Sequence, residues 1–146
     1  MEVSTRKRIL ICDDDDDLRQ TLGIILKKDY DIVEAADGSE ALKIIESERL
    51  HLVLLDISMP ELSGLQTLKA YHEEHPGLLT IILTSKPQIG IAKRALNRGA
   101  VAYITKPFDI AYLQDEIARV LSQPPEAEKA QGRPWHIVSP GESKRT

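Results

Sequence analysis

Cysteine is almost absent from this 146-residue chain, where Cys12 is the only one. A single cysteine excludes a disulfide framework and a cysteine-rich metal site. It fits a reducing compartment, and we expect the cytoplasm. No apolar run approaches the ~20 residues that cross a bilayer, and the polar segment 1–8 does not resemble a secretory signal. The sequence therefore predicts a protein with no membrane span and no disulfides.

Aromatic side chains and excess positive charge are also scarce. The chain has one Phe, one Trp and four Tyr, and its formal net charge is -4. Nucleic-acid-binding domains usually carry a basic surface, and those that bind single strands also stack bases on aromatic side chains. We therefore expect no direct nucleic-acid binding by this chain.

The chain does contain regularly alternating strand and helix signals. Its length suits one domain. Short apolar runs alternate with helical patterns, and the alternation is typical of a parallel sheet covered on both faces. With right-handed crossovers, we predict an α/β, flavodoxin-like (βα)5 doubly wound sheet with strand order 2-1-3-4-5. The predicted strands are 9–12, 31–35, 52–56, 78–83 and 101–105.

The predicted domain ends shortly after its last helix, at residue 122. Pro124 and Pro125 follow, and segment 123–146 mixes Glu, Lys, Gly and Pro without periodicity, so we predict a disordered or linker tail. Within it, the apolar stretch 135–138 is more readily interpreted as inert or loosely docked than as a partner-binding peptide. The domain organisation is thus 1–122 and 123–146.

Five consecutive aspartates, 13–17, follow the first predicted strand. Apolar residues spaced as one face of a helix begin at Leu18, so Asp15 and the two after it suit a helix N-cap and first turn. This accounts for three of the five. Asp13 and Asp14 are left at the end of the strand.

The predicted sheet brings five polar side chains to one edge. Parallel strands end at the same edge, and these ends carry Asp13, Asp14, Asp56, Thr84 and Lys106. Three converging carboxylates cannot all stay ionised without a cation, and such hard oxygen donors suit Mg²⁺. A carboxylate beside Mg²⁺ can attack a phosphoryl group, with Lys106 neutralising charge on the transferring oxygens and Thr84 hydrogen-bonding the attached group.

Each of these residues also has a simpler interpretation. The aspartates could cap a helix or loop, Thr84 could be a strand-end hydroxyl, and Lys106 could be a solvated charge. Each simpler interpretation is more common for a single residue. Their convergence on one sheet edge is improbable by chance, and it favours a phosphoryl-transfer site.

These motifs resemble the response-regulator receiver domain of two-component phosphorelay signalling, typified by chemotaxis regulators. As an ordered set at these spacings they are highly specific, and the resemblance covers residues 7–121. The matching stretches are 9–14, 54–60 with Gly64, 82–85, 99–100 and 103–108.

The resemblance implies a role for each site residue. Asp56 would accept a phosphoryl group from a histidine kinase phosphohistidine. Mg²⁺ would be held by Asp14, Asp56 and the backbone carbonyl of Ser58, with Asp13 acting mainly through water.

The resemblance also implies a switch and its partners. Thr84 would move towards the phosphoryl group while Tyr103 turns inward, which would remodel the surface of helix 4, strand 5 and helix 5. The partners would be a sensor histidine kinase or phosphotransfer protein, and a downstream effector or an output domain. No enzyme activity is expected beyond Mg²⁺-dependent self-phosphorylation and slow autodephosphorylation.

Three other functions fit the sequence less well. A haloacid-dehalogenase-like phosphohydrolase needs a second Asp two residues after its nucleophile, where this chain has Ser58. A dinucleotide-binding domain needs a G-x-G-x-x-G motif after the first strand, and none follows it. The main alternative is a phosphorylation-independent interaction module on the same fold, against which the complete acid set argues.

Overall fold

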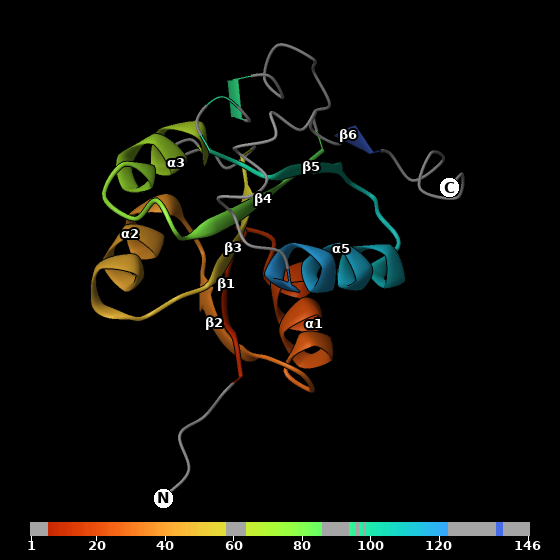
Figure 1. The fold of residues 1–146 in the computed structure, drawn as a ribbon. Helices are drawn as coiled ribbons and strands as arrows, with labels where there is room; N and C mark the ends of the chain where they lie inside the picture. The colour runs from red at the N-terminus through yellow and green to blue at the C-terminus, as the bar shows by residue number, and fades with distance from the viewer. Residues whose placement is uncertain are drawn as a thin grey trace, which may run out of the picture.

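A computed structural model describes residues 6–57, 64–85, 94, 95, 97, 99–122 and 137–138. Its centre is one parallel sheet with the strand order β2-β1-β3-β4-β5-β6 (Figure 1). The strands are β1 Arg8–Cys12, β2 Asp31–Ala35, β3 Leu52–Asp56, β4 Leu79–Thr84, β5 Ala102–Thr105 and β6 Ile137–Val138. The predicted order 2-1-3-4-5 and the α/β class are confirmed, with one additional strand at the β5 edge.

Helices cover both faces of the sheet, as the strand–helix alternation predicted. Figure 1 shows α1 and α5 on one side and α2 and α3 on the other. The helices are α1 Asp16–Leu26, α2 Gly38–Ser47, α3 Gly64–His72 and α5 Ile110–Ser122. The fourth predicted helix, 87–98, falls mostly outside the described residues, of which 94, 95 and 97 are helical.

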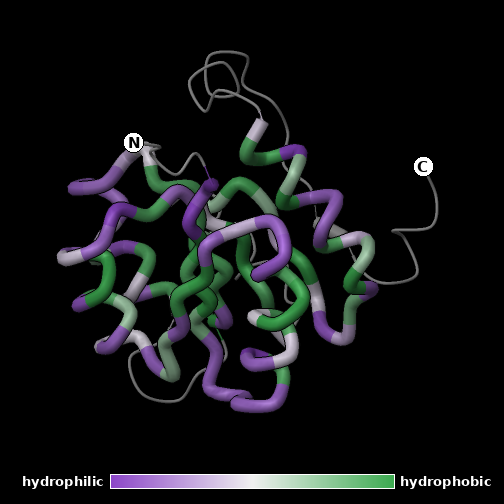
Figure 2. Tube along the Cα trace, turned by 90° about the horizontal axis from the view of Figure 1, so that it is seen from below, coloured by the Kyte–Doolittle hydropathy of each residue, from purple (hydrophilic) through white to green (hydrophobic). Residues whose placement is uncertain are grey.

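Two apolar clusters, one on each face, hold the helices against the sheet. In β3, the side chains of Val53 and Leu55 belong to the cluster under α2 and α3, whereas Leu52 and Leu54 belong to the cluster under α1 and α5. All of β3 is buried, because a central parallel strand is covered on both faces. Figure 2 shows the same arrangement, with apolar segments at the centre and hydrophilic segments around them.

Aspartates begin the first two helices. The Asp15 carboxylate accepts a hydrogen bond from the Leu18 amide at 3.1 Å, and Asp16 and Asp17 lie in the first turn of α1. This confirms the predicted capping role for three of the five aspartates, since carboxylates are favourable at a helix N-terminus. Asp37 caps α2 in the same way, through the Glu40 amide at 2.8 Å.

The sixth strand was not predicted. Ile137 pairs with Tyr103 and Val138 with Ile104, parallel to β5. Residues 123–136 and 139–146 lie outside the described part, so the linker assignment of the tail stays a prediction. Among the helices that the structure describes, none is long and apolar enough to cross a bilayer.

Candidate functional site

Three carboxylates meet at the carboxyl-terminal edge of the sheet. Asp13 directly follows β1 and Asp56 is the last residue of β3, which is the neighbouring strand. With Asp14, they each offer an oxygen within 4.8 Å of the others. Asp13 is 0% and Asp56 1% exposed, whereas Asp14 is exposed. The arrangement places two carboxylates in the interior and one towards solvent.

Lys106 reaches this cluster from the end of β5. Its Nζ lies 2.8 Å from Asp13 Oδ2 and 3.3 Å from Asp56 Oδ2. The backbone amide of Lys106 donates to the Thr84 carbonyl at 2.7 Å, which ties it to the end of β4, and the Lys106–Pro107 peptide bond is cis. Lys106 thus contributes one positive charge against three carboxylates.

Burial and the neighbouring charges both shift the protonation equilibria of Asp13 and Lys106. Burial raises the pKa of Asp13 above its ordinary value, and the hydrogen bonds from Lys106 and the Asp15 amide only partly oppose this. Burial alone would lower the pKa of Lys106, but the hydrogen bond to Asp13 and the charge of Asp56 leave it raised. Lys106 is therefore held as a cation, and a further cation would relieve the remaining repulsion.

The donor set fits Mg²⁺. Its atoms are hard carboxylate oxygens, two of the three residues are buried, and one ammonium does not balance them. A second group with metal-ligand spacing, Glu46 with Glu74 and His75, is more exposed, and His75 already pairs with Glu46 at 3.5 Å. The carbonyl of Ser58 lies outside the described residues, so its predicted metal contact stays a prediction.

The two predicted switch residues lie on adjacent strands. Thr84 ends β4 and is 1% exposed. Tyr103 on β5 lies opposite Ile82 of β4 and is also 1% exposed, within the apolar cluster under α2 and α3. Tyr103 therefore lies in the interior here, which is where the predicted switch would turn it. The switching roles of both residues stay predictions.

Arg19 was not among the predicted site residues. It is buried on α1, and its Nη1 donates to the backbone carbonyl of Asp13 at 2.6 Å. The sequence does contain a signal for this, because Arg19 shares a helix face with Leu22, Gly23 and Leu26, all of them buried. A cation on such a face has to find polar partners inside the protein.

Comparison with known proteins decides the family. The model of the response regulator receiver domain matches residues 9–118. The chain belongs to the response-regulator receiver family. Members of this family are receiver domains of two-component response regulators, which are switched by phosphorylation.

Curated relatives differ widely in the share of their length that this chain matches. Sporulation initiation phosphotransferase F of Bacillus subtilis is 33% identical over 116 residues, which are 79% of this chain and 94% of that protein. Transcriptional regulatory protein GlrR of Escherichia coli is 34% identical over 116 residues, 79% of this chain but only 26% of that protein. The chain thus spans about a quarter of the length of GlrR and about half of the length of another matched regulator, PhoP of Bacillus subtilis.

Solved receiver structures agree with the fold. The crystal structure of a CheY-like response regulator receiver domain protein from Methanospirillum hungatei has a TM-score of 0.80 and 35% identity, covering 85% of this chain and 99% of that one. The BeF3-activated DrrB receiver domain has a TM-score of 0.76 and 25% identity, covering 82% of this chain and all of that one.

Proposed function

We propose that this receiver accepts a phosphoryl group on Asp56 from a phosphohistidine of a sensor histidine kinase or phosphotransfer protein. The observation that carries the proposal is the convergence of buried Asp56 with Asp13, Asp14 and Lys106 at one sheet edge. Membership of the receiver family supports it.

The transfer exchanges one bond of phosphorus for another. A carboxylate oxygen of Asp56 attacks phosphorus, the P–N bond to imidazole breaks, and its electron pair stays on the nitrogen. Asp56 is rigidly held at the end of a buried strand, which keeps the nucleophile in place. The Lys106 ammonium, 3.3 Å from Asp56 Oδ2, is close enough to stabilise charge on the phosphoryl oxygens.

The acidic residues have two proposed roles, which are to bind the metal ion and to position Lys106. Asp14 and Asp56 would hold Mg²⁺ together with the Ser58 carbonyl, and Asp13 would act mainly through water. When bound, Mg²⁺ supplies neutralisation of the developing negative charge. The contact of Asp13 with Lys106 at 2.8 Å supports a second task, which is to aim the ammonium at the site.

Phosphorylation would bias a two-state element next to the acceptor. Thr84 hydrogen-bonds the phosphoryl group, and the inward position of Tyr103 is favoured with it. The surface that changes is formed by the predicted fourth helix, 87–98, together with β5 and α5. A downstream effector, or an output domain of the kind that longer regulators carry, would bind it.

The proposed chemistry is stoichiometric rather than enzymatic. The chain takes up one phosphoryl group from a donor and loses it by slow autodephosphorylation, and we place it in the cytoplasm, where its donors act. The domain that does this is residues 1–122, with 123–146 as its tail.

Intact-mass measurement after incubation with acetyl phosphate and Mg²⁺ tests this proposal. We expect a gain of one phosphoryl group by the native chain, no gain by Asp56→Asn, and a strongly reduced rate for Lys106→Ala. Asp115→Asn is the matched control, because Asp115 is an exposed aspartate on α5, and it should gain the group like the native chain.

The result that would overturn the proposal is equally concrete. If the native chain gains no phosphoryl group from acetyl phosphate or from a panel of histidine kinases, the phosphorylation-independent interaction module becomes the better description. A gain that persists in Asp56→Asn would instead move the acceptor to another residue.

A further inference from the structure

Arg19 is a buried cation whose guanidinium is shared among three segments. Its side chain is 11% exposed. Nη1 donates to the Asp13 carbonyl at 2.6 Å, Nε lies 3.0 Å from Glu34 Oε1 on β2, and Nη2 lies 2.7 Å from Asp16 Oδ1. One side chain of α1 therefore links the loop after β1, the edge strand β2 and its own first turn.

The contact with the Asp13 carbonyl bears directly on the acid cluster. That carbonyl belongs to the peptide unit joining Asp13 to Asp14, so the position of this plane sets where both side chains start. The Asp13 amide donates to the Ala35 carbonyl at 3.1 Å, and Asp13 Oδ1 accepts from the Asp15 amide at 2.9 Å. Arg19 adds a further hydrogen bond to Asp13, in which its guanidinium donates to the Asp13 backbone carbonyl.

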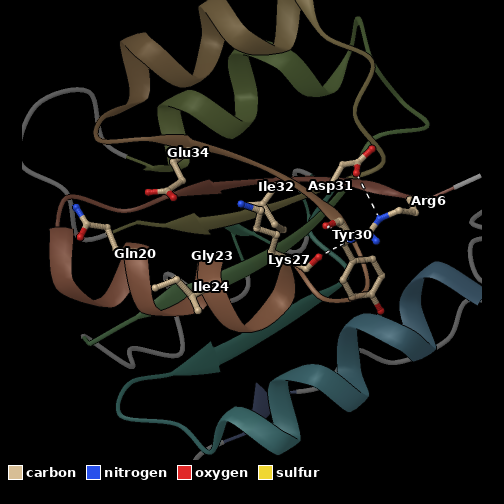
Figure 3. Close-up of a pocket in the computed structure, with 9 residues that line it drawn as sticks. All are labelled: Arg6, Gln20, Gly23, Ile24, Lys27, Tyr30, Asp31, Ile32 and Glu34. Carbon is tan, nitrogen blue, oxygen red and sulfur yellow. Dashed lines mark hydrogen bonds and ion pairs between the residues drawn. The ribbon is translucent and has the colours of Figure 1, made fainter. Parts of the chain in front are cut away.

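The surroundings of Arg19 are built to keep its partner Glu34 in place. A Cβ added at Gly23 would lie 3.0 Å from Glu34 Oε2, so glycine leaves the room that this carboxylate occupies. Figure 3 shows Gly23 on α1 and Glu34 on β2 lining the same hollow, which has a volume of about 710 Å³. The ion pair between Arg19 and Glu34 joins α1 to β2 beside this hollow.

Charge alone does not account for this arrangement. Glu34 and Asp16 together outweigh the single positive charge of Arg19, so the group offers no uncompensated cation to the acid cluster. In the ion pair between Arg19 and Asp16, the Asp16 side chain is 70% exposed, and such exposed ion pairs contribute little to stability. What remains distinctive is the geometry, because the guanidinium contacts its partners through three different nitrogens held in one plane, whereas the three N–H groups of an ammonium share a single nitrogen.

We propose that Arg19 is a positioning residue for the acid cluster: it holds the Asp13–Asp14 peptide unit so that both carboxylates face Asp56, and Glu34 holds Arg19. This deepens the proposed phosphoryl-acceptor function and rests on it. Partners behind metal ligands typically change metal affinity or activity 10–100-fold when they are removed.

Mg²⁺ titration calorimetry and the rate of phosphoryl gain from acetyl phosphate test this on the full chain. We expect Arg19→Gln to weaken Mg²⁺ binding about 10-fold and to slow phosphoryl gain similarly. Arg19→Lys should not restore either value. Glu34→Gln should remain near the native values, because an amide oxygen can still accept from Nε, whereas Glu34→Ala should fall between.

Arg119→Gln is the matched control, since Arg119 forms a comparable ion pair with Glu116 at 2.9 Å on α5. All titrations are made well below each variant's melting temperature. A purely structural role would lower the melting temperature and leave the Mg²⁺ affinity of the folded protein unchanged. If Arg19→Gln does not fold, Arg19→Lys and Glu34→Ala carry the same comparison.

The outcomes separate the two proposals. Arg19→Gln binding Mg²⁺ within twofold of the native chain, or full rescue by Arg19→Lys, overturns the positioning role while the phosphoryl-acceptor function stands. A native chain that binds Mg²⁺ but gains no phosphoryl group contradicts the proposed function, and the Mg²⁺ series still decides the role of Arg19. If the native chain binds no Mg²⁺, the positioning role is also overturned, because there is then no Mg²⁺ affinity for Arg19 to support.

Discussion

Single ionisable residues at the two ends of β3 experience opposite conditions. At the carboxyl end, Asp56 meets other carboxylates and one lysine. Just before the strand's first residue, His51 lies among cations, and its Nδ1 accepts a hydrogen bond from the Arg8 amide at 3.0 Å. Burial, followed by the charges of Lys7, Arg49 and Arg8, lowers the pKa of His51 below 6.5. Only the neutral ring can accept the Arg8 bond.

His51 therefore predicts a pH dependence of stability with a definite sign. Its folded pKa is depressed, so the unfolded chain binds more protons below pH 6.5. The contribution of His51 to the free energy of unfolding is fully present above that value and is lost as the pH falls towards the folded pKa. We expect the melting temperature of the native chain to fall more than that of His51→Gln between about pH 7.5 and 5.5.

Thermal unfolding followed by circular dichroism at several pH values measures this difference. Other titrating groups are present in both proteins and cancel in the comparison, while glutamine keeps an acceptor for the Arg8 amide. Parallel pH profiles for the two proteins would contradict the assignment of the shift to His51.

At the level of elements, the start of α3 packs directly on the end of β3. A Cβ added at Gly64 would lie 2.4 Å from the Ile57 Cα and 2.8 Å from the Asp56 carbonyl oxygen. These are backbone atoms, which cannot rotate away as a flexible side chain can. Glycine at position 64 therefore allows the helix to approach the strand that carries the acceptor aspartate.

Gly64→Ala is expected to destabilise the fold. Overpacking at a tight contact typically costs about 1–3 kcal/mol, and the contact here is with the backbone. Gly77→Ala is the control, because nothing lies within 4 Å of its Cβ position. It should leave stability unchanged or raise it by up to about 1 kcal/mol. Urea unfolding of both variants measures the difference, and equal free energies of unfolding would show that the approach at Gly64 is not tight.

At the scale of the whole molecule, the segment beyond α5 contributes strand β6, which pairs with β5. Among the described residues, two pairs join β6 to β5, whereas two apolar clusters hold the other strands. The proposed domain boundary at residue 122 rests on the end of α5 at Ser122 and on Pro124 and Pro125, which follow it. It predicts that the chain folds without its last 24 residues, 123–146.

Removal of 123–146 tests the boundary. We expect cooperative thermal unfolding within a few degrees of the full chain, since a ~1 kcal/mol loss shifts such a domain by roughly 2–8 °C. Hydrogen exchange should become faster in the β5 segment, 102–105, whose outer edge is uncovered. Loss of the cooperative transition would show that the tail is part of the domain, and unchanged exchange in β5 would contradict the pairing with β6.

Much of the fold was predictable from local patterns. Apolar runs and helix periodicity identified the first five strands, because burial on a parallel sheet imposes near-continuous apolar stretches. Asp15 was predictable as a cap because capping depends on residues within one helical turn. The identities of Asp13, Asp14, Asp56, Thr84 and Lys106 followed from the sheet order alone, since each stands at the end of a strand.

By itself, the sequence determined the strand order, the class of fold and which residue types gather at the sheet edge. Only the tertiary structure decided how they meet: the contacts of Lys106 with two carboxylates, the burial of Arg19 against the Asp13 carbonyl, and the pairing of β6 with β5. These contacts join residues from different elements, and β6 is too short to have a periodicity of its own. Local sequence patterns determine where strands and helices form, whereas the distances between their side chains are set only when these elements pack together.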